Sequence, residues 1–257
     1  MATGDKTVGY ETMGDGPHKV LALHGWFGDH TTFRPLRDAL SLSEFTYASV
    51  AYRGYGLSRH LAGTYTMAEI STDAIAVADA LGWNEFSLIG HSMGGMAVQR
   101  ILIDAPGRVR KLVAVTPVPA SGVPFDPQTA QLFEGAADDL DNRRAIIDFS
   151  TGNRLSRAWI DHMARYSDET ADRKAFAAYL TAWTKTDIHA GILGNPVPVR
   201  VIVGAHDGAL TADVMTATYL AWYPNASLEV MTNAGHYPMN ETPVALATSI
   251  EAFLRAA

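Results

Sequence analysis

The sequence predicts an α/β fold: a mostly parallel central sheet with helices on both faces, and a helical cap inserted into it. Short apolar runs alternate with helix-like segments over the first part of the chain, which is typical of a parallel sheet. Strand-like sequence then disappears from about Pro117 to Ile192 and returns at Val199. The 257 residues, of which 47% are hydrophobic, suffice for one large core domain with an insertion.

The elements of the first part can be placed from local patterns. Thr66-Met67-Ala68-Glu69 matches a capping box that begins a helix, and Gly82 supplies its end. Helical spacing of apolar residues predicts an earlier helix over Thr31–Leu42. The expected strands are Lys6–Met13, Lys19–Leu23, Phe45–Ala51, Phe86–Ile89 and Lys111–Val115, and a helix follows the fourth strand to about Asp104.

The second part of the chain returns to the core after the insertion. Strands are expected at Val199–Val203 and Leu228–Met231, and a last helix with Thr242 at its N-cap and Pro243 at its first position. We therefore expect residues 1–116 and 193–257 to form the core domain and residues 117–192 to form the helical cap.

Composition narrows the class of protein. The formal net charge of −7 and the lack of basic runs disfavour a nucleic-acid groove or an anionic membrane surface. The absence of cysteine excludes disulfides and thiolate chemistry. The first residues lack an apolar signal-like region, and no stretch approaches about 18 uninterrupted apolar residues. We expect a soluble, cytoplasmic protein that acts on a small molecule, with neither nucleic acid nor membrane as partner.

Three glycines crowd one serine in Gly90-His91-Ser92-Met93-Gly94-Gly95, between a strand and a helix. A sharp strand-to-helix turn strains its apex residue, and glycines let the two elements pass closely. Ser92 would then stand clear at the carboxyl edge of the sheet, in the G-x-S-x-G pattern of a nucleophile elbow. The structural alternative is that the Ser92 hydroxyl caps the following helix.

A serine nucleophile needs a base, which must itself be held by a third group. His236 follows the last strand and Asp207 follows the strand at Val199–Val203, so both lie where parallel sheets build their sites. The chain order Ser92, Asp207, His236 also matches this arrangement. His206 is the local competitor for the base, but it is too close to Asp207 in sequence to be the expected distant partner.

Two backbone N–H groups are candidates for stabilising a developing oxyanion. Met93 follows the serine directly, and Trp26 follows a strand within His24-Gly25-Trp26, where the glycine lets the chain curl over the elbow. We expect the N–H groups of Trp26 and Met93 to converge on one oxygen.

Taken together, these residues resemble the α/β-hydrolase superfamily, and within it the small serine esterase, lactonase and non-haem perhydrolase group with a helical cap. The segments that match are Leu21–Gly25, Arg53–Ser58, Gly90–Gly95 and Gly235-His236. The resemblance implies Ser92 as nucleophile, His236 as base, Asp207 as acid, Trp26 and Met93 as oxyanion hole, and no cofactor. Related sequences commonly carry an aspartate where this chain has Ala51, which concerns loop packing more than catalysis. Serine at the elbow disfavours haloalkane dehalogenase and epoxide hydrolase chemistry.

The expected function is hydrolysis of a carboxylic ester of a small apolar or aromatic substrate through an acyl-enzyme on Ser92. The aromatic insertion would roof the pocket, and Trp26, Trp159 and Trp183 are the expected substrate contacts. Alternatives are a lactone, enol-lactone or carbon–carbon bond hydrolase or a perhydrolase with the same triad, a slow-turnover small-molecule receptor, and cofactor-free oxygen chemistry. Histidine and carboxylate spacing does not predict a metal site.

Overall fold

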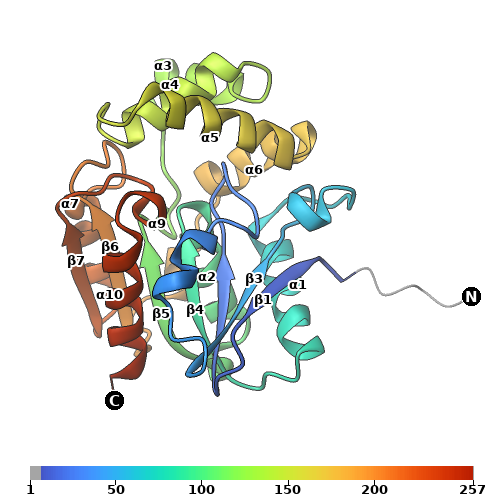
Figure 1. Ribbon diagram of the computed structural model, residues 1–257, viewed down its shortest axis with the longest axis vertical. Helices are drawn as coiled ribbons and strands as arrows, with labels where there is room; N and C mark the ends of the chain where they lie inside the picture. The colour runs from blue at the N-terminus through green and yellow to red at the C-terminus, as the bar shows by residue number, and fades with distance from the viewer. Residues whose placement is uncertain (1–6, 257) are drawn as a thin grey trace, which may run out of the picture.

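A seven-stranded sheet runs through the computed structural model, which describes residues 7–256 (Figure 1). The strand order is β1-β3-β2-β4-β5-β6-β7. β1 pairs antiparallel with β3, and the other neighbouring strands pair parallel, which confirms the predicted mostly parallel sheet. The strands are β1 (Tyr10–Met13), β2 (His18–Leu23), β3 (Phe45–Val50), β4 (Phe86–His91), β5 (Val109–Val115), β6 (Val199–Gly204) and β7 (Ala226–Met231).

Helices connect the parallel strands and form the cap. None of the helices between residues 7 and 256 combines the length and the apolar character needed to cross a membrane. The α-helices are α1 (Met67–Ala80), α2 (Met93–Asp104), α3 (Pro127–Gly135), α4 (Leu140–Ser150), α5 (Arg157–Thr170), α6 (Arg173–Lys185), α7 (Ala212–Ala217), α8 (Tyr219–Trp222), α9 (Pro238–Glu241) and α10 (Pro243–Arg255). Short 3₁₀ helices are η1 (Arg34–Ala39), η2 (Gly56–Ser58), η3 (Pro106–Arg108) and η4 (His189–Gly191).

Both faces of the sheet are covered. In β4, a Cβ added to Gly90 would lie 2.8 Å from Val98 of α2. The adjacent Ile89 lines a small apolar cavity with Leu36 of η1 and Ile250 of α10. Because successive strand residues point to opposite faces, α2 lies on one side of the sheet and the pair η1 and α10 lies on the other.

Two expected elements are shorter in the structure. The helix expected over Thr31–Leu42 is a 3₁₀ helix of six residues, η1. The Asp29 carboxylate accepts both the N–H and the hydroxyl of Thr31, each at 2.7 Å, and so holds the first expected turn in a different conformation. The first strand begins at Tyr10 rather than at Lys6, which lies outside the described residues.

The N-terminal caps predicted for α1 and α10 differ in whether the structure contains their hydrogen bonds. The Thr66 hydroxyl accepts the Glu69 N–H at 3.2 Å, as a capping box requires. The Glu69 carboxylate, however, accepts the N–H of Tyr65 at 2.7 Å rather than that of Thr66. Thr242 does precede α10, but its side chain makes no cap hydrogen bond. Its hydroxyl donates to the Pro238 carbonyl of the preceding turn α9 instead, at 3.4 Å.

Helices α3 to α6 lie between β5 and β6 in sequence and stand together above one edge of the sheet (Figure 1). This edge is where the parallel strands end. The boundaries of the cap at 117 and 192 stay a prediction. What the structure gives is a layer of four helices over the ends of β2, β4, β5, β6 and β7.

A buried arginine organises the inside of this helical layer. Arg143 of α4 is 1% exposed, and its guanidinium lies 4.0 Å from the centre of the Phe176 ring of α6. It donates to the Ala136 carbonyl at 2.7 Å and to the Ser167 hydroxyl of α5 at 3.0 Å. Asp168 supplies a carboxylate at 3.2 Å. One side chain therefore joins α4, α5 and α6.

We expect Arg143→Met to destabilise the protein by about 1–3 kcal/mol, because it leaves buried acceptors without a donor. The matched control is Arg144→Met on the same helix, where the guanidinium makes ion pairs with Asp141 and Asp161 nearer the surface. Surface ion pairs contribute little, so this variant should lose much less. Urea unfolding measures both, and equal losses would contradict the joining role of Arg143.

Candidate active site

Ser92 occupies the turn between β4 and α2 and has a left-handed backbone conformation, with φ 55° and ψ −118°. Such a conformation is strained for a residue with a side chain. Its N–H donates to the Val115 carbonyl of β5 at 3.0 Å, and its carbonyl accepts the N–H groups of Gly95 at 2.7 Å and Val118 at 2.9 Å. The Ser92 side chain makes no cap hydrogen bond to α2 in the described chain. The turn therefore presents a hydroxyl that the helix does not use.

Two glycines make this turn possible. A Cβ on Gly94 would lie 2.3 Å from the Leu23 carbonyl oxygen and 2.8 Å from that of His24. A Cβ on Gly90 would lie 2.3 Å from the Gly94 carbonyl oxygen. Helix α2 thus begins in direct contact with the end of β2, and any larger residue at position 94 would push them apart.

His236 and Asp207 form a hydrogen-bonded pair beside this turn. His236 Nδ1 lies 2.7 Å from Asp207 Oδ2. The other carboxylate oxygen accepts the N–H groups of Ala209 at 2.9 Å and Leu210 at 3.0 Å. Burial alone would raise the pKa of Asp207, but His236 and these two N–H groups outweigh it, so the pKa lies below its usual value. The carboxylate stays charged and fixes which imidazole nitrogen carries the proton.

The backbone of His236 is fixed by groups from three elements. Its N–H donates to the Ser150 carbonyl at the end of α4 at 3.0 Å. Its carbonyl accepts the Thr116 hydroxyl at 3.1 Å and His91 Nε2 at 2.8 Å. His206, the competing base, lies elsewhere in this loop, and its Cβ packs 3.0 Å from the position of a Cβ on Gly152. The ring in contact with Asp207 is that of His236.

His91 was not singled out from the sequence, although it is the variable residue before Ser92. Because Nε2 donates to a carbonyl, the proton is on Nε2 and Nδ1 has none. Burial, followed by the proximity of His236, lowers the pKa of His91 to about 3. A neutral imidazole thus braces the loop that carries His236. The sequence feature that could have indicated this role is a histidine at the last position of a buried strand, directly before Ser92.

The loop at Trp26 is held by its carbonyl groups and by its indole. The Tyr52 hydroxyl donates to the His24 carbonyl and the Tyr55 hydroxyl to the Trp26 carbonyl, each at 2.9 Å. Trp26 Nε1 donates to the Phe176 carbonyl of α6 at 2.7 Å. Neither Tyr52 nor Tyr55 was predicted to have this role.

The backbone N–H of Trp26 takes no part in that network. A Cβ on Gly25 would lie 3.0 Å from the Ser92 Cβ, so the loop passes directly beside the serine. Within residues 7–256, neither the Trp26 N–H nor the Met93 N–H donates to a protein acceptor. Two free N–H groups therefore flank Ser92, as an oxyanion site requires.

A cavity of about 70 Å³ opens beside Ser92 and His236. Trp26 lies in its wall and stacks on Phe176 at 4.1 Å and on Phe133 at 5.8 Å. Trp183 also lines the cavity, whereas Trp159 does not and instead packs edge-on against Tyr237 at 5.5 Å. The residues that line it are Trp26, Phe27, Ser92, Val118, Val123, Phe125, Phe133, Ile146, Ser150, Trp183, Asp207, Ala209, Leu210, His236 and Tyr237.

Charged ligand groups do not gather in the way a metal site needs. Among the residues that the structure describes, no group of three or more histidine, aspartate or glutamate side chains is placed to hold a metal ion. What the arrangement offers is a hydroxyl, an imidazole held by a carboxylate, and two free N–H groups around an apolar cavity.

Comparisons with known proteins show the family to which the chain belongs. Residues 20–249 match the family model described as the alpha/beta hydrolase family. A 2-hydroxymuconate semialdehyde hydrolase from Pseudomonas putida is 30% identical over 78% of this chain and 74% of its own length. A pimeloyl-[acyl-carrier protein] methyl ester esterase from Serratia marcescens is 25% identical over 96% of this chain and 98% of its own length. Another curated relative, 27% identical, is longer, and the match spans 63% of it.

Solved structures share the fold. An esterase from Exiguobacterium antarcticum superposes with a TM-score of 0.85 at 18% sequence identity, covering 96% of this chain and 95% of the other. At this identity the likeness concerns the fold alone.

We expect Gly94→Ala to cost about 1–3 kcal/mol of stability, because the new Cβ must displace backbone rather than a flexible side chain. Gly107→Ala is the matched control, since a Cβ there would meet nothing within 4 Å. Thermal or urea unfolding of the two variants gives the comparison. A Gly94→Ala variant as stable as Gly107→Ala would contradict the close contact between α2 and β2.

The buried histidines predict a pH dependence of stability. Mainly because of burial, the pKa of His24 is lowered from 6.5 to about 4 and that of His91 from 6.5 to about 3. Between pH 6.5 and pH 4 the unfolded chain therefore binds more protons at these positions than the native protein does. The free energy of unfolding should fall as pH decreases, by up to about 1.4 kcal/mol per pH unit for each histidine.

Urea unfolding from pH 7 to pH 4.5 measures this slope. His91→Gln keeps an N–H donor for the His236 carbonyl and should give a shallower slope than the parent. The exposed His60→Gln serves as the control. Identical slopes for the parent and His91→Gln would contradict a neutral, buried His91.

Proposed function

Because the chain belongs to the alpha/beta hydrolase family, we propose that it is a serine hydrolase that cleaves carboxylic esters with a short apolar acyl group. The observation that carries the proposal is that Ser92, with a hydroxyl that caps no helix, shares one cavity with the hydrogen-bonded pair of His236 and Asp207. The match to a curated methyl ester esterase supports an ester as the bond that is cleaved.

The first half of the reaction acylates the enzyme. His236 takes the proton of Ser92 as the serine oxygen attacks the ester carbonyl carbon, and Asp207 stabilises the imidazolium that forms. The tetrahedral intermediate then collapses: the bond from the carbonyl carbon to the alcohol oxygen breaks, and the alcohol leaves with the proton held by His236. The acyl group is now bonded to Ser92.

The second half returns the enzyme to its starting state. A water molecule gives a proton to His236 and its oxygen attacks the acyl carbon. The bond to Ser92 breaks, Ser92 regains its proton from His236, and the carboxylic acid is released. No oxidant, reductant or cofactor is consumed in either half.

The free N–H groups of Trp26 and Met93 would stabilise the oxyanion in both halves. Such donors stabilise an oxyanion most when their positions are fixed before the reaction. The hydrogen bonds from Tyr52 and Tyr55 to the carbonyls of His24 and Trp26 hold the Trp26 loop in this way. In a comparable site, removal of one oxyanion donor costs about 3–4 kcal/mol of transition-state stabilisation.

The acyl group is proposed to lie in the cavity beside Ser92. Its walls are mostly apolar and aromatic, and its volume of about 70 Å³ is small. A short, uncharged acyl chain fits such a space, whereas a long chain would have to displace the stacked rings of Trp26, Phe133 and Phe176.

A second candidate is hydrolysis of a bond other than an ester with the same three residues. The 30% identity with the hydrolase of 2-hydroxymuconate semialdehyde favours this alternative. In that case the cavity would hold the electrophilic carbonyl carbon in the same place beside Ser92. Absence of ester turnover, together with Ser92-dependent hydrolysis of a semialdehyde substrate, would select it.

Steady-state hydrolysis of nitrophenyl esters from acetate to decanoate tests the proposal. We expect the highest kcat/KM at two to four acyl carbons, and a loss of at least about 10⁴-fold in kcat for Ser92→Ala. Asp207→Asn should lose about 10⁴-fold, because the wrong imidazole tautomer is then favoured.

Ser227→Ala on β7 is the matched control for removal of a serine hydroxyl, and it should keep parental activity. Turnover that survives Ser92→Ala would overturn the proposal. A burst of one equivalent followed by no further release would instead point to a slow-turnover receptor.

A further inference from the structure

A second, larger cavity lies next to the Ser92 cavity. This groove has a volume of about 380 Å³ and runs between helix α5 of the cap and residues 28–35 of the core. Tyr237 lines both the groove and the Ser92 cavity, so its side chain is a wall that the two share. The groove therefore adjoins the Ser92 cavity at this residue.

Tyr237 offers a hydrogen-bond donor at this wall. Its side chain is 5% exposed, and its ring packs against His236 at 5.2 Å and His91 at 5.6 Å. Its hydroxyl makes no hydrogen bond to any residue in the described part of the chain. Burial, and then the charges of Asp207 and Glu241, raise the pKa of Tyr237, so the phenol keeps its proton. The phenol hydroxyl is therefore available to donate a hydrogen bond to a bound ligand.

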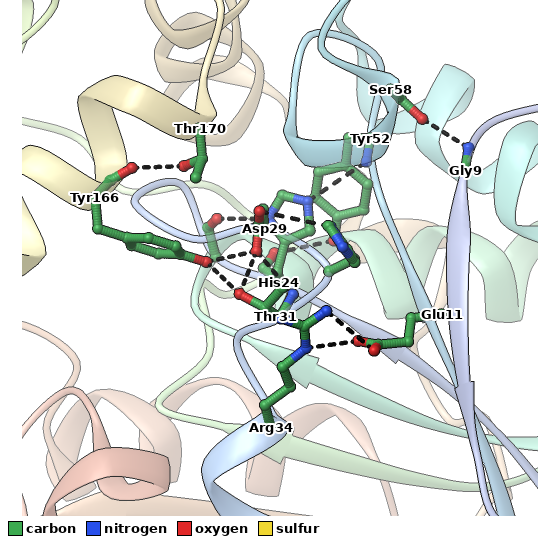
Figure 2. Close-up of polar contacts among 12 residues, drawn as sticks. Gly9, Glu11, His24, Asp29, Thr31, Arg34, Tyr52, Ser58, Tyr166 and Thr170 are labelled. Atoms are coloured by element: carbon green, nitrogen blue, oxygen red, sulfur yellow. Dashed lines mark hydrogen bonds and ion pairs between the residues drawn. The ribbon is translucent and has the colours of Figure 1, made fainter.

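The charged side chains Asp29 and Arg34 beside the groove already make hydrogen bonds within the protein. Figure 2 shows that the Asp29 carboxylate is held by the hydroxyls of Thr31 and Tyr166, at 2.7 and 2.5 Å. The Arg34 guanidinium makes two hydrogen bonds to Glu11, at 2.8 and 3.0 Å. The Arg34 charge is therefore paired with that of Glu11, and the Asp29 carboxylate already accepts two hydroxyl hydrogen bonds.

Neutral polar groups at the groove also lack a hydrogen-bond partner within residues 7–256. Asn240 of α9 lines the groove, and within residues 7–256 its side-chain amide makes no hydrogen bond. The Thr32 hydroxyl is buried at the same groove and also lacks a partner there. His162 of α5 adds an exposed imidazole. Neutral donors and acceptors recognise an uncharged polar group better than an ion.

The chemistry of acyl transfer decides which half of an ester would lie in this groove. His236 gives its proton to the leaving oxygen, so the alcohol half must lie on the imidazole side of the tetrahedral carbon. Tyr237 directly follows His236, and its ring stands edge-on to the imidazole, with an angle of 83° between the planes. The apolar cavity behind Trp26 remains for the acyl half.

We propose that the groove binds the alcohol half of the ester, that this alcohol is uncharged and carries hydroxyl groups, and that Tyr237 and Asn240 determine this specificity. The inference rests on the proposed ester hydrolysis at Ser92 and adds the chemical class of the leaving group. It requires neither residue to move a proton, so both are specificity-determining rather than catalytic.

Two acetate esters with three-carbon alcohols test the inference: propyl acetate and 2,3-dihydroxypropyl acetate. The measured quantity is the ratio of their kcat/KM values, dihydroxypropyl over propyl, divided by the ratio of their alkaline hydrolysis rates in solution. We expect this normalised ratio to exceed about three for the parent, since one neutral hydrogen bond is worth a factor of about two to ten.

Tyr237→Phe and Asn240→Ala should each lower the normalised ratio by about two- to tenfold, through the dihydroxypropyl ester. Tyr10→Phe, which deletes a phenol hydroxyl from β1, is the matched control and should keep the parental ratio. A thermal melt of each variant shows whether it is folded. Because both kcat/KM values are measured on the same preparation, their ratio does not depend on the fraction of active protein.

A parental ratio near one, or a ratio that Tyr237→Phe and Asn240→Ala leave unchanged, would overturn the alcohol subsite while Ser92-dependent turnover of both esters upheld the proposed function. If neither ester is hydrolysed in a Ser92-dependent manner, both the proposed function and the subsite fail. The two failures are therefore distinguishable in one set of assays.

Discussion

The contact between the start of α2 and the end of β2 is the constraint on which the rest of the site depends. With no side chain at Gly94, the helix backbone approaches the carbonyl groups of Leu23 and His24. This approach leaves Ser92 at a positive φ and brings the Trp26 loop beside it. The hydroxyl and both free N–H groups thus come from one close packing of backbone, which is stiffer than an arrangement of side chains.

The cap is tied to this centre at several points. The His236 N–H donates to Ser150 of α4, Trp26 Nε1 donates to Phe176 of α6, and the Tyr166 hydroxyl of α5 donates to Asp29. Each bond joins a cap helix to a core loop at the edge of the site. The cap therefore acts as a fixed wall, and displacing any one helix would disturb the loop that it holds.

Much of the core could be predicted from sequence because its signals are local. A buried parallel strand reads as a short apolar run, and the glycines around Ser92 mark a turn that few other residues permit. The positions of Asp207 and His236 followed from the rule that parallel strands end at one edge. These inferences needed only chain order and spacing.

The cap could not be predicted in the same detail, because the contacts of its residues are determined by tertiary packing and not by local sequence patterns. Trp159 and Trp183 look alike in sequence, yet Trp183 lines the cavity and Trp159 packs on Tyr237. Arg143 is buried through contacts with Phe176, Ala136 and Ser167, which belong to other segments of the chain and are not encoded by local sequence. Likewise, the turn at Asp29 replaced a helical start through a hydrogen bond that helical spacing does not encode.

Trp26 links recognition of the acyl group to stabilisation of charge under the proposed mechanism. Its backbone N–H would stabilise the oxyanion, while its indole lines the cavity proposed for the acyl group and stacks on Phe133 and Phe176. An acyl group that displaced the indole would also move the N–H donor. Poorly fitting acyl groups should therefore lose transition-state stabilisation as well as binding, and the selectivity of the cavity should be expressed in kcat as well as in KM.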